Sequence, residues 1–422
     1  MEAVILFAVL FLFLIIGLPV AASIGLSCIV YLITFYDAGM LIQLPTKMFA
    51  SNDSYVLLAI PLFVFAGYIM EAGGISKRLV DFIYTLVGRL PGALGTVAIL
   101  ACMIFAALTG SAIATVAAIG SIMFPYMVEK GYKKEVAAGM IACAGALGPI
   151  IPPSVPMVIY GSTMGVSVAD LFLGGVVPGV IMGAAMVVFN TIYALKNKLP
   201  KSDEAFSLKK CISALWRSMG VLFLPVLILG GIYGGFITAT EAGTLAACYS
   251  LLLTLIYRSM SMKTFIAACR KTVVTTGCLL LIINIANMFA YIMSMENIPQ
   301  KIAKILMPYM NSTATYMIVL FLFLVVVGCV MDSGPAILIL APIIVPIGTT
   351  LGINPIFLGT MFCCILCMGA VTPPFGIALF TSASTNHVPF GDVIKGALPY
   401  ILLSFLVLLL LCFFPDIVML LL

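Results

Sequence analysis

Long apolar runs, separated by short polar or glycine-rich segments, occupy most of the chain. A helix that crosses the hydrocarbon core of a bilayer needs about 20 apolar residues, and runs of that length therefore predict membrane-crossing helices. The predicted spans are 54–70, 136–166, 171–195, 219–236, 241–257, 272–294, 356–386 and 393–415. The run 3–36 is too long for one untilted span, and its break at Gly17-Leu18-Pro19 predicts two short helices.

Two further apolar segments, 92–128 and 313–350, are interrupted near the middle by a polar or glycine-rich break. We expect each to fold back on itself as a re-entrant helical hairpin. A short amphipathic stretch precedes each one, at 75–89 and 299–308. These stretches predict arms that link parts of the molecule, or alternatively surface helices at the membrane interface.

The composition places most of the protein surface in lipid. Hydrophobic residues make up 64% of the 422 positions and charged residues 8%, whereas soluble proteins are roughly 45–50% apolar and about 25% charged. The sequence has no GxxxxGK[ST] phosphate loop, and its single His387 excludes HExxH zinc chemistry. No basic run alternates with aromatic residues, so nucleic acid is not an expected partner. These features predict a polytopic membrane protein.

Basic residues predict the orientation of the spans, because segments rich in Lys and Arg stay in the cytoplasm. Six such residues lie in 196–217 and four in 258–271. Counting spans outward from these two segments places both ends of 92–128 in the cytoplasm. The same counting places both ends of 313–350, and both chain termini, on the opposite side.

The two halves of the chain are related by an internal repeat with a constant offset of 221 residues. The matched positions are Ser111 and Asp332, Pro125 and Pro346, Gly131 and Gly352, Gly148 and Gly369, Pro152-Pro153 and Pro373-Pro374, and Pro178 and Pro399. Upstream, Tyr68-Ile69-Met70 matches Tyr291-Ile292-Met293 at an offset of 223. Because the two copies have opposite predicted orientations, the repeat is inverted, which is typical of secondary transporters.

The predicted fold is therefore an all-α polytopic membrane protein with an inverted-topology repeat, two re-entrant hairpins and two broken transmembrane helices. We divide it into four parts. Residues 1–53 form N-terminal scaffold spans, and 54–195 form the first repeat. Residues 196–271 form a cytoplasmic linker with two inter-repeat spans, and 272–422 form the second repeat with the last span.

Each repeat contains two breaks at membrane depth, where non-helical backbone is tolerated only if protein or a watery cavity satisfies it. The first repeat has 109–112 at a hairpin tip and 145–154 inside a span, and the second has 332–335 and 369–376. Proline frees backbone carbonyls, which suit Na⁺, and new helix N-termini suit a carboxylate. A kink for packing is the alternative at any one break, but four breaks at matched positions favour a binding site.

Asp332 is the strongest single candidate for a functional residue, since it is the only charged side chain between Lys304 and His387. An acidic residue inside the membrane is functional by default, and we expect it to contribute a cation ligand. N-capping of the second hairpin helix is a second role, compatible with the first. No Lys or Arg falls within a predicted membrane core. An anionic substrate is therefore expected to be held by dipoles, hydroxyls, backbone N–H groups and bound cations.

Five segments carry a resemblance to a known family: 110–115 (GSAIAT), 145–154 (GALGPIIPPS), 237–243 (ITATEAG), 331–336 (MDSGPA) and 369–376 (GAVTPPFG). Together they resemble the large membrane subunit of tripartite ATP-independent periplasmic (TRAP) transporters, of the DctM/SiaM type. Ala239 is a departure, because family members often have Pro in a T-P-T-E-A motif. From the residues themselves, 238–241 predicts a capping box that opens a helix.

The resemblance implies a permease, not an enzyme, in the bacterial inner membrane, and the count of spans then predicts both termini in the periplasm. It implies Na⁺-driven transport of an organic acid, such as a C4-dicarboxylate or sialic acid, by an elevator mechanism of the ion-transporter-superfamily type. The implied partners are a small four-helix membrane subunit and a periplasmic substrate-binding protein. Two or more Na⁺ ions would be the coupling ions.

The resemblance also implies where the sites lie. One Na⁺ site is framed by the tip at Ser111 and the break 145–154, and the other by the tip at Asp332 and the break 369–376. The substrate lies between them. Candidate substrate-binding residues are Ser111, Ser154, Asp332, Ser333 and Thr372. Candidate Na⁺ ligands are Thr109, Gly110, Ser111, Gly145, Gly148, Pro152, Asp332, Gly334, Gly369, Thr372, Pro373 and Gly376.

Three alternatives arise from the sequence, and two of them stay open: a stand-alone carrier and proton coupling. A stand-alone ion-coupled anion carrier of the same architecture would need no binding protein. A membrane enzyme would need a His, a pair of carboxylates or a metal constellation at one membrane depth, and the sequence offers none. Proton coupling through Asp332 is the alternative to Na⁺ coupling.

Overall fold

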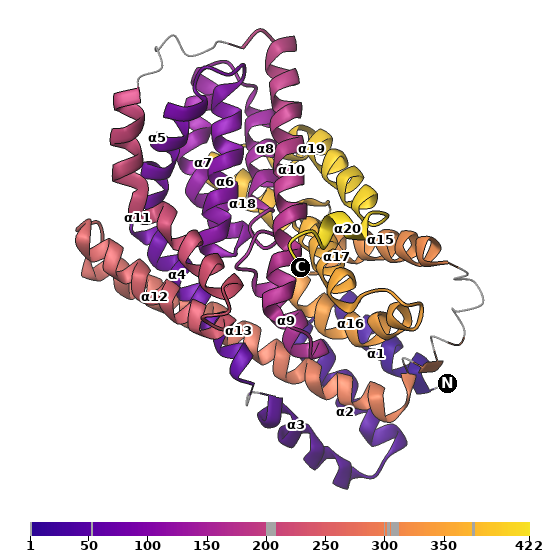
Figure 1. The fold of residues 1–422 in the computed structure, drawn as a ribbon. Helices are drawn as coiled ribbons and strands as arrows, with labels where there is room; N and C mark the ends of the chain where they lie inside the picture. The colour runs from indigo at the N-terminus through magenta and orange to yellow at the C-terminus, as the bar shows by residue number, and fades with distance from the viewer. Residues whose placement is uncertain are drawn as a thin grey trace.

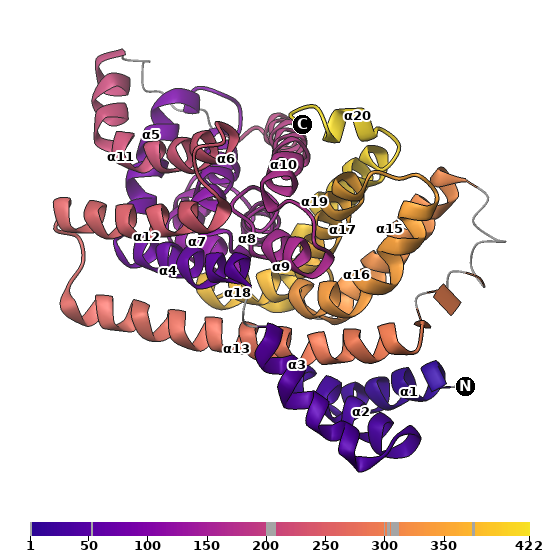
Figure 2. The same ribbon diagram turned by 60° about the horizontal axis from the view of Figure 1, so that its bottom comes forward.

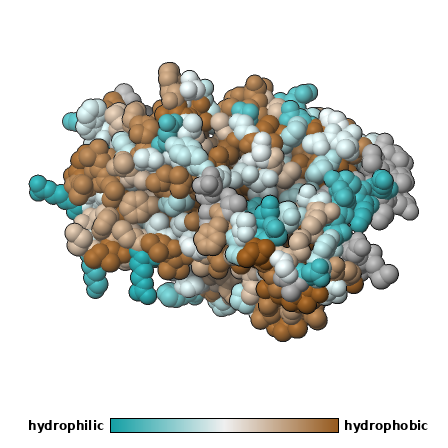
Figure 3. All heavy atoms as spheres, turned by 90° about the horizontal axis from the view of Figure 1, so that it is seen from below, coloured by the Kyte–Doolittle hydropathy of each residue, from teal (hydrophilic) through white to brown (hydrophobic). Residues whose placement is uncertain are grey.

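The computed structural model describes residues 2–51, 54–199, 208–298, 300–301, 304, 312–373 and 376–422. Within these ranges the regular elements are all helical, as predicted (Figure 1). Nine of the described helices are long and apolar enough to cross a membrane. Large apolar side chains such as Phe11, Leu255, Val273, Val326 and Leu402 lie on the outer surface, and hydrophobic residues cover much of the face in Figure 3. The chain is a multi-pass membrane protein.

The N-terminal run forms two short helices, as predicted from its internal break. Helix α1 spans Glu2–Ile16 and α2 spans Val20–Phe35. Between them, Gly17 has a φ of +91°, and Pro19 lacks the N–H that a continuous helix requires. Helix α3 (Gln43–Ser51) follows.

The first repeat consists of seven α-helices. They are α4 (Ala59–Ala72), α5 (Ile75–Val87), α6 (Ala93–Thr109), α7 (Ala112–Glu129), α8 (Lys134–Gly145), α9 (Val155–Met164) and α10 (Val168–Lys196). The segment 92–128 is thus a helical hairpin, α6–α7, whose helices pack on each other. The predicted span 136–166 is broken into α8 and α9 at the glycine- and proline-rich segment between them.

Two long helices connect the repeats, α11 (Leu208–Tyr233) and α12 (Ala239–Ile256), and a third, α13 (Met262–Met295), leads into the predicted second repeat. The capping box predicted at the start of α12 is confirmed, because Thr238 and Glu241 bond each other's backbone N–H groups. Helix α13 begins ten residues before the predicted span. A second capping box, made by Ser261 and Thr264, starts it there and carries the helix through a charged stretch that the sequence suggested was a loop.

The second repeat follows the order of the first. After α13, its described helices are α15 (Thr313–Val330), α16 (Ser333–Thr350), α17 (Pro355–Met368), the short η4 (Gly369–Val371), α18 (Ile377–Asn386) and α19 (Phe390–Leu411), followed by α20 (Pro415–Val418). From α6 and α15 onward, matched helices begin 220 to 222 residues apart. Gly131 and Gly352, which follow the two hairpins, both have positive φ, +92° and +78°. Most of the predicted amphipathic stretch 299–308 lies outside the described residues.

The two repeats exchange their short half-helices. Helix α9 of the first repeat packs against α16 of the second, and α18 of the second packs against α7 of the first. Helices α8 and α19 approach through glycines, since a Cβ on Gly139 would lie 2.2 Å from the Ala397 nitrogen and one on Gly396 would lie 1.8 Å from the Glu135 carbonyl oxygen. Figure 2 shows α13 running beneath both repeats, with α1–α3 on its other side.

Candidate functional site

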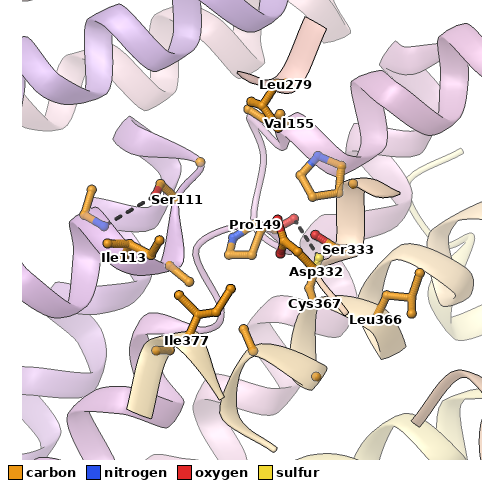
Figure 4. Close-up of a pocket in the computed structure, with 18 of the residues that line it drawn as sticks. Ser111, Ile113, Pro149, Val155, Leu279, Asp332, Ser333, Leu366, Cys367 and Ile377 are labelled. Carbon is orange, nitrogen blue, oxygen red and sulfur yellow. Dashed lines mark hydrogen bonds between the residues drawn. The ribbon is translucent and has the colours of Figure 1, made fainter. Parts of the chain in front are cut away.

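A cavity of about 270 Å³ lies where the two hairpin tips meet the breaks (Figure 4). Both repeats line it, together with residues of α4 and α13. Its walls are mainly apolar, with a few polar groups from the tips. This combination of an apolar enclosure and a few convergent polar groups is typical of small-molecule sites, although the volume is just below the usual range of about 300–1,000 Å³.

The first tip is a neutral turn whose polar groups bond one another. Gly110 ends α6 with a φ of +59°, a conformation that glycine adopts without a steric penalty. Ser111 then caps α7, its hydroxyl accepting a hydrogen bond from the Ala114 N–H at 3.4 Å. The Thr115 hydroxyl donates to the Ser111 carbonyl at 2.8 Å and lies 3.2 Å from the Thr109 hydroxyl. Three hydroxyls and a carbonyl are therefore collected at this tip.

The first tip lies directly against the first break. A Cβ on Gly110 would lie 2.5 Å from the Pro153 carbonyl oxygen, and one on Gly148 would lie 2.8 Å from the Ser111 carbonyl oxygen. Beyond the break, the buried Ser154 caps α9 by accepting a hydrogen bond from the Met157 N–H at 3.3 Å. The side chain of Ser154 also donates to the Pro149 carbonyl. The predicted pairing of this tip with 145–154 is thus present in the structure.

The second tip carries the charged residue. Asp332 occupies the N-cap position of α16, but its side chain makes no capping hydrogen bond. The carboxylate is exposed to the pocket, so the N-cap role weighed for this residue is filled by its backbone position only. Figure 4 shows Asp332 and Ser333 beside Pro149 and Cys367. The Cys367 thiol lies 3.8 Å from the Pro149 carbonyl oxygen, which joins the second repeat to the first break.

The second break is tied to the second hairpin by close backbone contact. A Cβ on Gly369 would lie 2.5 Å from both the Cα and the carbonyl oxygen of Gly328 in α15. The Thr372 hydroxyl donates to the Met368 carbonyl at 3.1 Å. Gly376 has a φ of +42° and precedes α18. Pro374, part of the matched proline pair, lies outside the described residues.

Eight of the predicted site residues line the cavity and six do not. The lining residues are Thr109, Gly110, Ser111, Asp332, Ser333, Gly334, Gly369 and Gly376. Gly145, Gly148, Pro152, Ser154, Thr372 and Pro373 belong to the breaks but do not line this cavity. The structure therefore brings the two tips together from opposite repeats and leaves part of each break outside the cavity lining.

Sequence reasoning missed three polar residues at the site. Tyr68 and Thr275 line the cavity, and their hydroxyls lie 3.0 Å apart, joining α4 to α13. The Lys271 ammonium lies 3.3 Å from Glu71 and 5.5 Å from the centre of the Tyr68 ring, so one cation stands close to the cavity wall. The repeat match between 68–70 and 291–293 was the sequence signal that could have identified Tyr68. Thr115, the third missed residue, lies within the 110–115 motif.

The donor set fits a hard cation and a carboxylate. Unwound backbone carbonyls, hydroxyl oxygens and one carboxylate are the ligands that Na⁺ takes at broken helices. The N-terminal ends of α7 and α16, whose N-cap residues are Ser111 and Asp332, reach the cavity. Free N–H groups and the positive end of the helix dipole favour anionic groups there.

Comparison with known proteins identifies what this chain resembles. A family model described as "Tripartite ATP-independent periplasmic transporter, DctM component" matches residues 7–417. The 2,3-diketo-L-gulonate TRAP transporter large permease protein YiaN of Escherichia coli K12 is 37% identical over 412 residues, which cover 96% of this chain and 95% of that protein. The C4-dicarboxylate TRAP transporter large permease protein DctM of Vibrio cholerae is 38% identical over 436 residues, covering 98% and 96%.

Among solved structures, the YdaH transporter of Alcanivorax borkumensis has a similar fold. The two superpose with a TM-score of 0.58 at 13% sequence identity, covering 89% of this chain and 88% of that one. At this identity the likeness concerns the fold alone.

Proposed function

Since the chain belongs to the DctM component family of tripartite ATP-independent periplasmic (TRAP) transporters, we propose that it is a permease for Na⁺-coupled uptake of an organic acid. Members of this family are large permease components of transporters and not enzymes. The observation that carries the proposal is the cavity between the two hairpin tips, with the uncapped Asp332 carboxylate facing it.

The substrate is proposed to be a carboxylate of the C4-dicarboxylate or sialic acid type. Two relatives are named for organic acids, 2,3-diketo-L-gulonate and C4-dicarboxylate, which supports this class. The substrate lies between Ser111 and Asp332, held by hydroxyls and helix N-termini. No Lys or Arg is among the described residues that line this cavity. The negative charge of the substrate is therefore offset by neighbouring Na⁺ ions.

Two Na⁺ sites are proposed, one for each pair of tip and break. The first uses oxygens of Thr109, Ser111 and the 145–154 backbone, and the close contacts of Gly110 and Gly148 support that pairing. The second uses Asp332 and the 369–376 backbone. The Gly328–Gly369 contact between α15 and this break supports the second pairing.

Transport is proposed to proceed by an elevator movement in the bacterial inner membrane, with both termini in the periplasm. The two hairpins and the two broken helices move as one body, which the exchange of α9 and α18 between repeats supports. The other spans form the fixed frame together with a small four-helix membrane subunit. A periplasmic binding protein delivers the substrate.

The test is substrate uptake into proteoliposomes that contain this chain, its small partner and the binding protein, with and without an inward Na⁺ gradient. We expect uptake to require both Na⁺ and the binding protein, and to be lost on Asp332→Ala substitution. The matched control is Asp392→Ala, which removes an exposed acid outside the cavity. Uptake without the binding protein would instead identify a stand-alone carrier. Uptake that follows a pH gradient and ignores Na⁺ would contradict Na⁺ coupling.

A further inference from the structure

A second cavity, of about 450 Å³, lies between α5 and α11 and shares no lining residue with the first. Three of its lining side chains are basic and one is acidic. The lining residues are Arg78, Asp81, Lys209, Ser213, Ala214, Arg217 and Ser218. With three cations against one acid, the described lining of this groove carries a net positive charge.

The groove is held in shape by contacts on both of its walls. The buried Ser218 hydroxyl of α11 donates to the Arg78 carbonyl of α5 at 2.9 Å. The Arg78 guanidinium lies 3.8 Å from the centre of the Tyr257 ring, at the end of α12, and this cation–π contact fixes its position. On the opposite wall, Lys209, Ser213 and Arg217 recur every four residues and therefore share one face of α11.

The groove lies at the level where a membrane helix meets the lipid headgroups. Arg217 is the last charged residue of α11, and the apolar span within that helix extends to Tyr233. Trp216, the single tryptophan of the chain, is 75% exposed beside it, and tryptophan is enriched at membrane interfaces. Because the basic residues around 196–217 indicate the cytoplasmic side, the groove opens at the cytoplasmic leaflet.

We propose that the α5–α11 groove binds the phosphate of an anionic phospholipid of the cytoplasmic leaflet. Basic pockets between membrane helices on this side attract such headgroups. The phosphate lies among Arg78, Lys209 and Arg217, with the Ser213 hydroxyl as a further donor. Exposed apolar side chains on the same part of α11, Ile212, Leu215 and Met219, flank the site and receive the acyl chains. This flanking apolar surface is why a lipid, and not free phosphate, is the occupant.

The experiment measures lipid binding to the purified full-length chain in detergent by native mass spectrometry. The probes are phosphatidylglycerol, phosphatidylethanolamine and inorganic phosphate, each titrated separately. We expect tighter binding of phosphatidylglycerol than of phosphatidylethanolamine, and no displacement of bound lipid by millimolar phosphate. Equal binding of the two lipids would contradict the proposal. Displacement by phosphate alone would identify a free-anion site and overturn the lipid assignment.

Substitutions inside and outside the groove test whether the lipid binds there. Removal of one cation near the membrane surface weakens anionic-lipid binding about fivefold, so Lys209→Gln with Arg217→Gln should weaken it about 25-fold. Asp81→Asn should tighten binding, because it removes the one acid among the described residues that line the groove. The control pair Lys133→Gln with Lys263→Gln, basic residues outside the groove, should leave binding unchanged.

The control must also separate binding from folding. All variants should unfold in lipid-free detergent at the wild-type temperature, since these side chains are largely exposed. If the control pair loses as much lipid as the groove pair, general surface charge explains the binding and the proposal fails. The outcome does not depend on which solute the chain transports.

Discussion

The two hairpin tips occupy the same position in their repeats, yet they differ in charge, bonding and space. At the first tip, Ser111 caps α7 and Thr115 bonds the Ser111 carbonyl. At the second tip, Asp332 makes no capping bond and its carboxylate faces the cavity. The two repeats therefore have equivalent turns at their hairpin tips. The first tip carries a neutral residue that caps its helix, and the second carries an acidic residue that faces the cavity without capping its helix.

The two tips also differ in how closely neighbouring atoms pack around their glycines. The first tip leaves no room at Gly110, because the Pro153 carbonyl oxygen is 2.5 Å from where a Cβ would stand. At the second tip, the nearest atom to a Cβ on Gly334 is the Ile159 Cδ1, at 3.6 Å. The first tip is thus fixed by backbone contact, whereas the second has space to adjust when a ligand binds beside Asp332.

The largest effect is expected at the charged tip. Asp332→Asn keeps the shape of the side chain and removes its negative charge, so that the second tip becomes neutral like the first. We expect the initial rate of uptake in proteoliposomes to fall about 100-fold or more, the size of a lost charged contact of about 3 kcal/mol. Unfolding in detergent should change little, since Asp332 contributes no capping bond. An uptake rate close to wild type would show that the two tips do not differ in function.

A pair of alanine substitutions measures the difference in space. Gly110→Ala should lower the free energy of unfolding by about 2 kcal/mol or more, because it adds left-handed strain of about 1–2 kcal/mol to a backbone clash. Gly334→Ala should be neutral or slightly stabilising, since this position lies at the start of α16 with room for a methyl group. Thermal unfolding of the two purified variants gives the comparison. Equal losses would show that the second tip is as tightly held as the first.

Removal of the cap at the neutral tip should have a moderate effect. Ser111→Ala deletes a capping bond worth about 1 kcal/mol and one of several oxygens proposed for the first Na⁺ site. Because the Ser111 carbonyl and the other oxygens remain, we expect a roughly fivefold slower uptake. Ser111→Thr retains a hydroxyl and serves as the control. A 100-fold loss in the alanine variant would instead make the neutral tip as important as the charged one.

The smallest effect is expected at the wall that faces both tips. Tyr68→Phe removes one member of the hydroxyl pair between α4 and α13, and a neutral hydrogen bond contributes about 1 kcal/mol. A double-mutant cycle with Thr275→Val should give a coupling energy of about 0.5–1 kcal/mol in thermal unfolding. Additive effects would mean that the two hydroxyls, although 3.0 Å apart, do not stabilise the contact between these helices.

Local patterns predicted much of this arrangement, because they act within a few residues. The break before Pro19, the capping box at Thr238 and the two hairpins all follow from neighbouring residues, and the constant repeat offset predicted that the tips correspond. The early start of α13 was missed because hydropathy outweighed the Ser261–Thr264 capping box. Lys263, Arg270 and Lys271 resembled a loop, although all three lie within the long helix α13.

Other features had no local signal at all. The hydroxyl pair Tyr68–Thr275 joins residues 207 positions apart, and the packing of α9 on α16 depends on how the two repeats dock. A polar residue in an apolar run does not identify its partner, so sequence alone could name candidates at the tips but not the wall opposite them. Thr115, in contrast, has an ordinary local interpretation, because a threonine one turn into a helix commonly bonds the backbone of its own helix. It was therefore not identified as a site residue.

The exchange of half-helices between repeats also imposes an order of assembly during synthesis. Helix α7 leaves the ribosome about 250 residues before α18, the helix that packs against it. At a translation rate of about 5–20 residues per second, the first hairpin waits roughly 12 to 50 s in the membrane without that partner. The hydroxyl bonds within its tip suit this interval, because they satisfy polar groups that would otherwise face lipid while the rest of the chain is made.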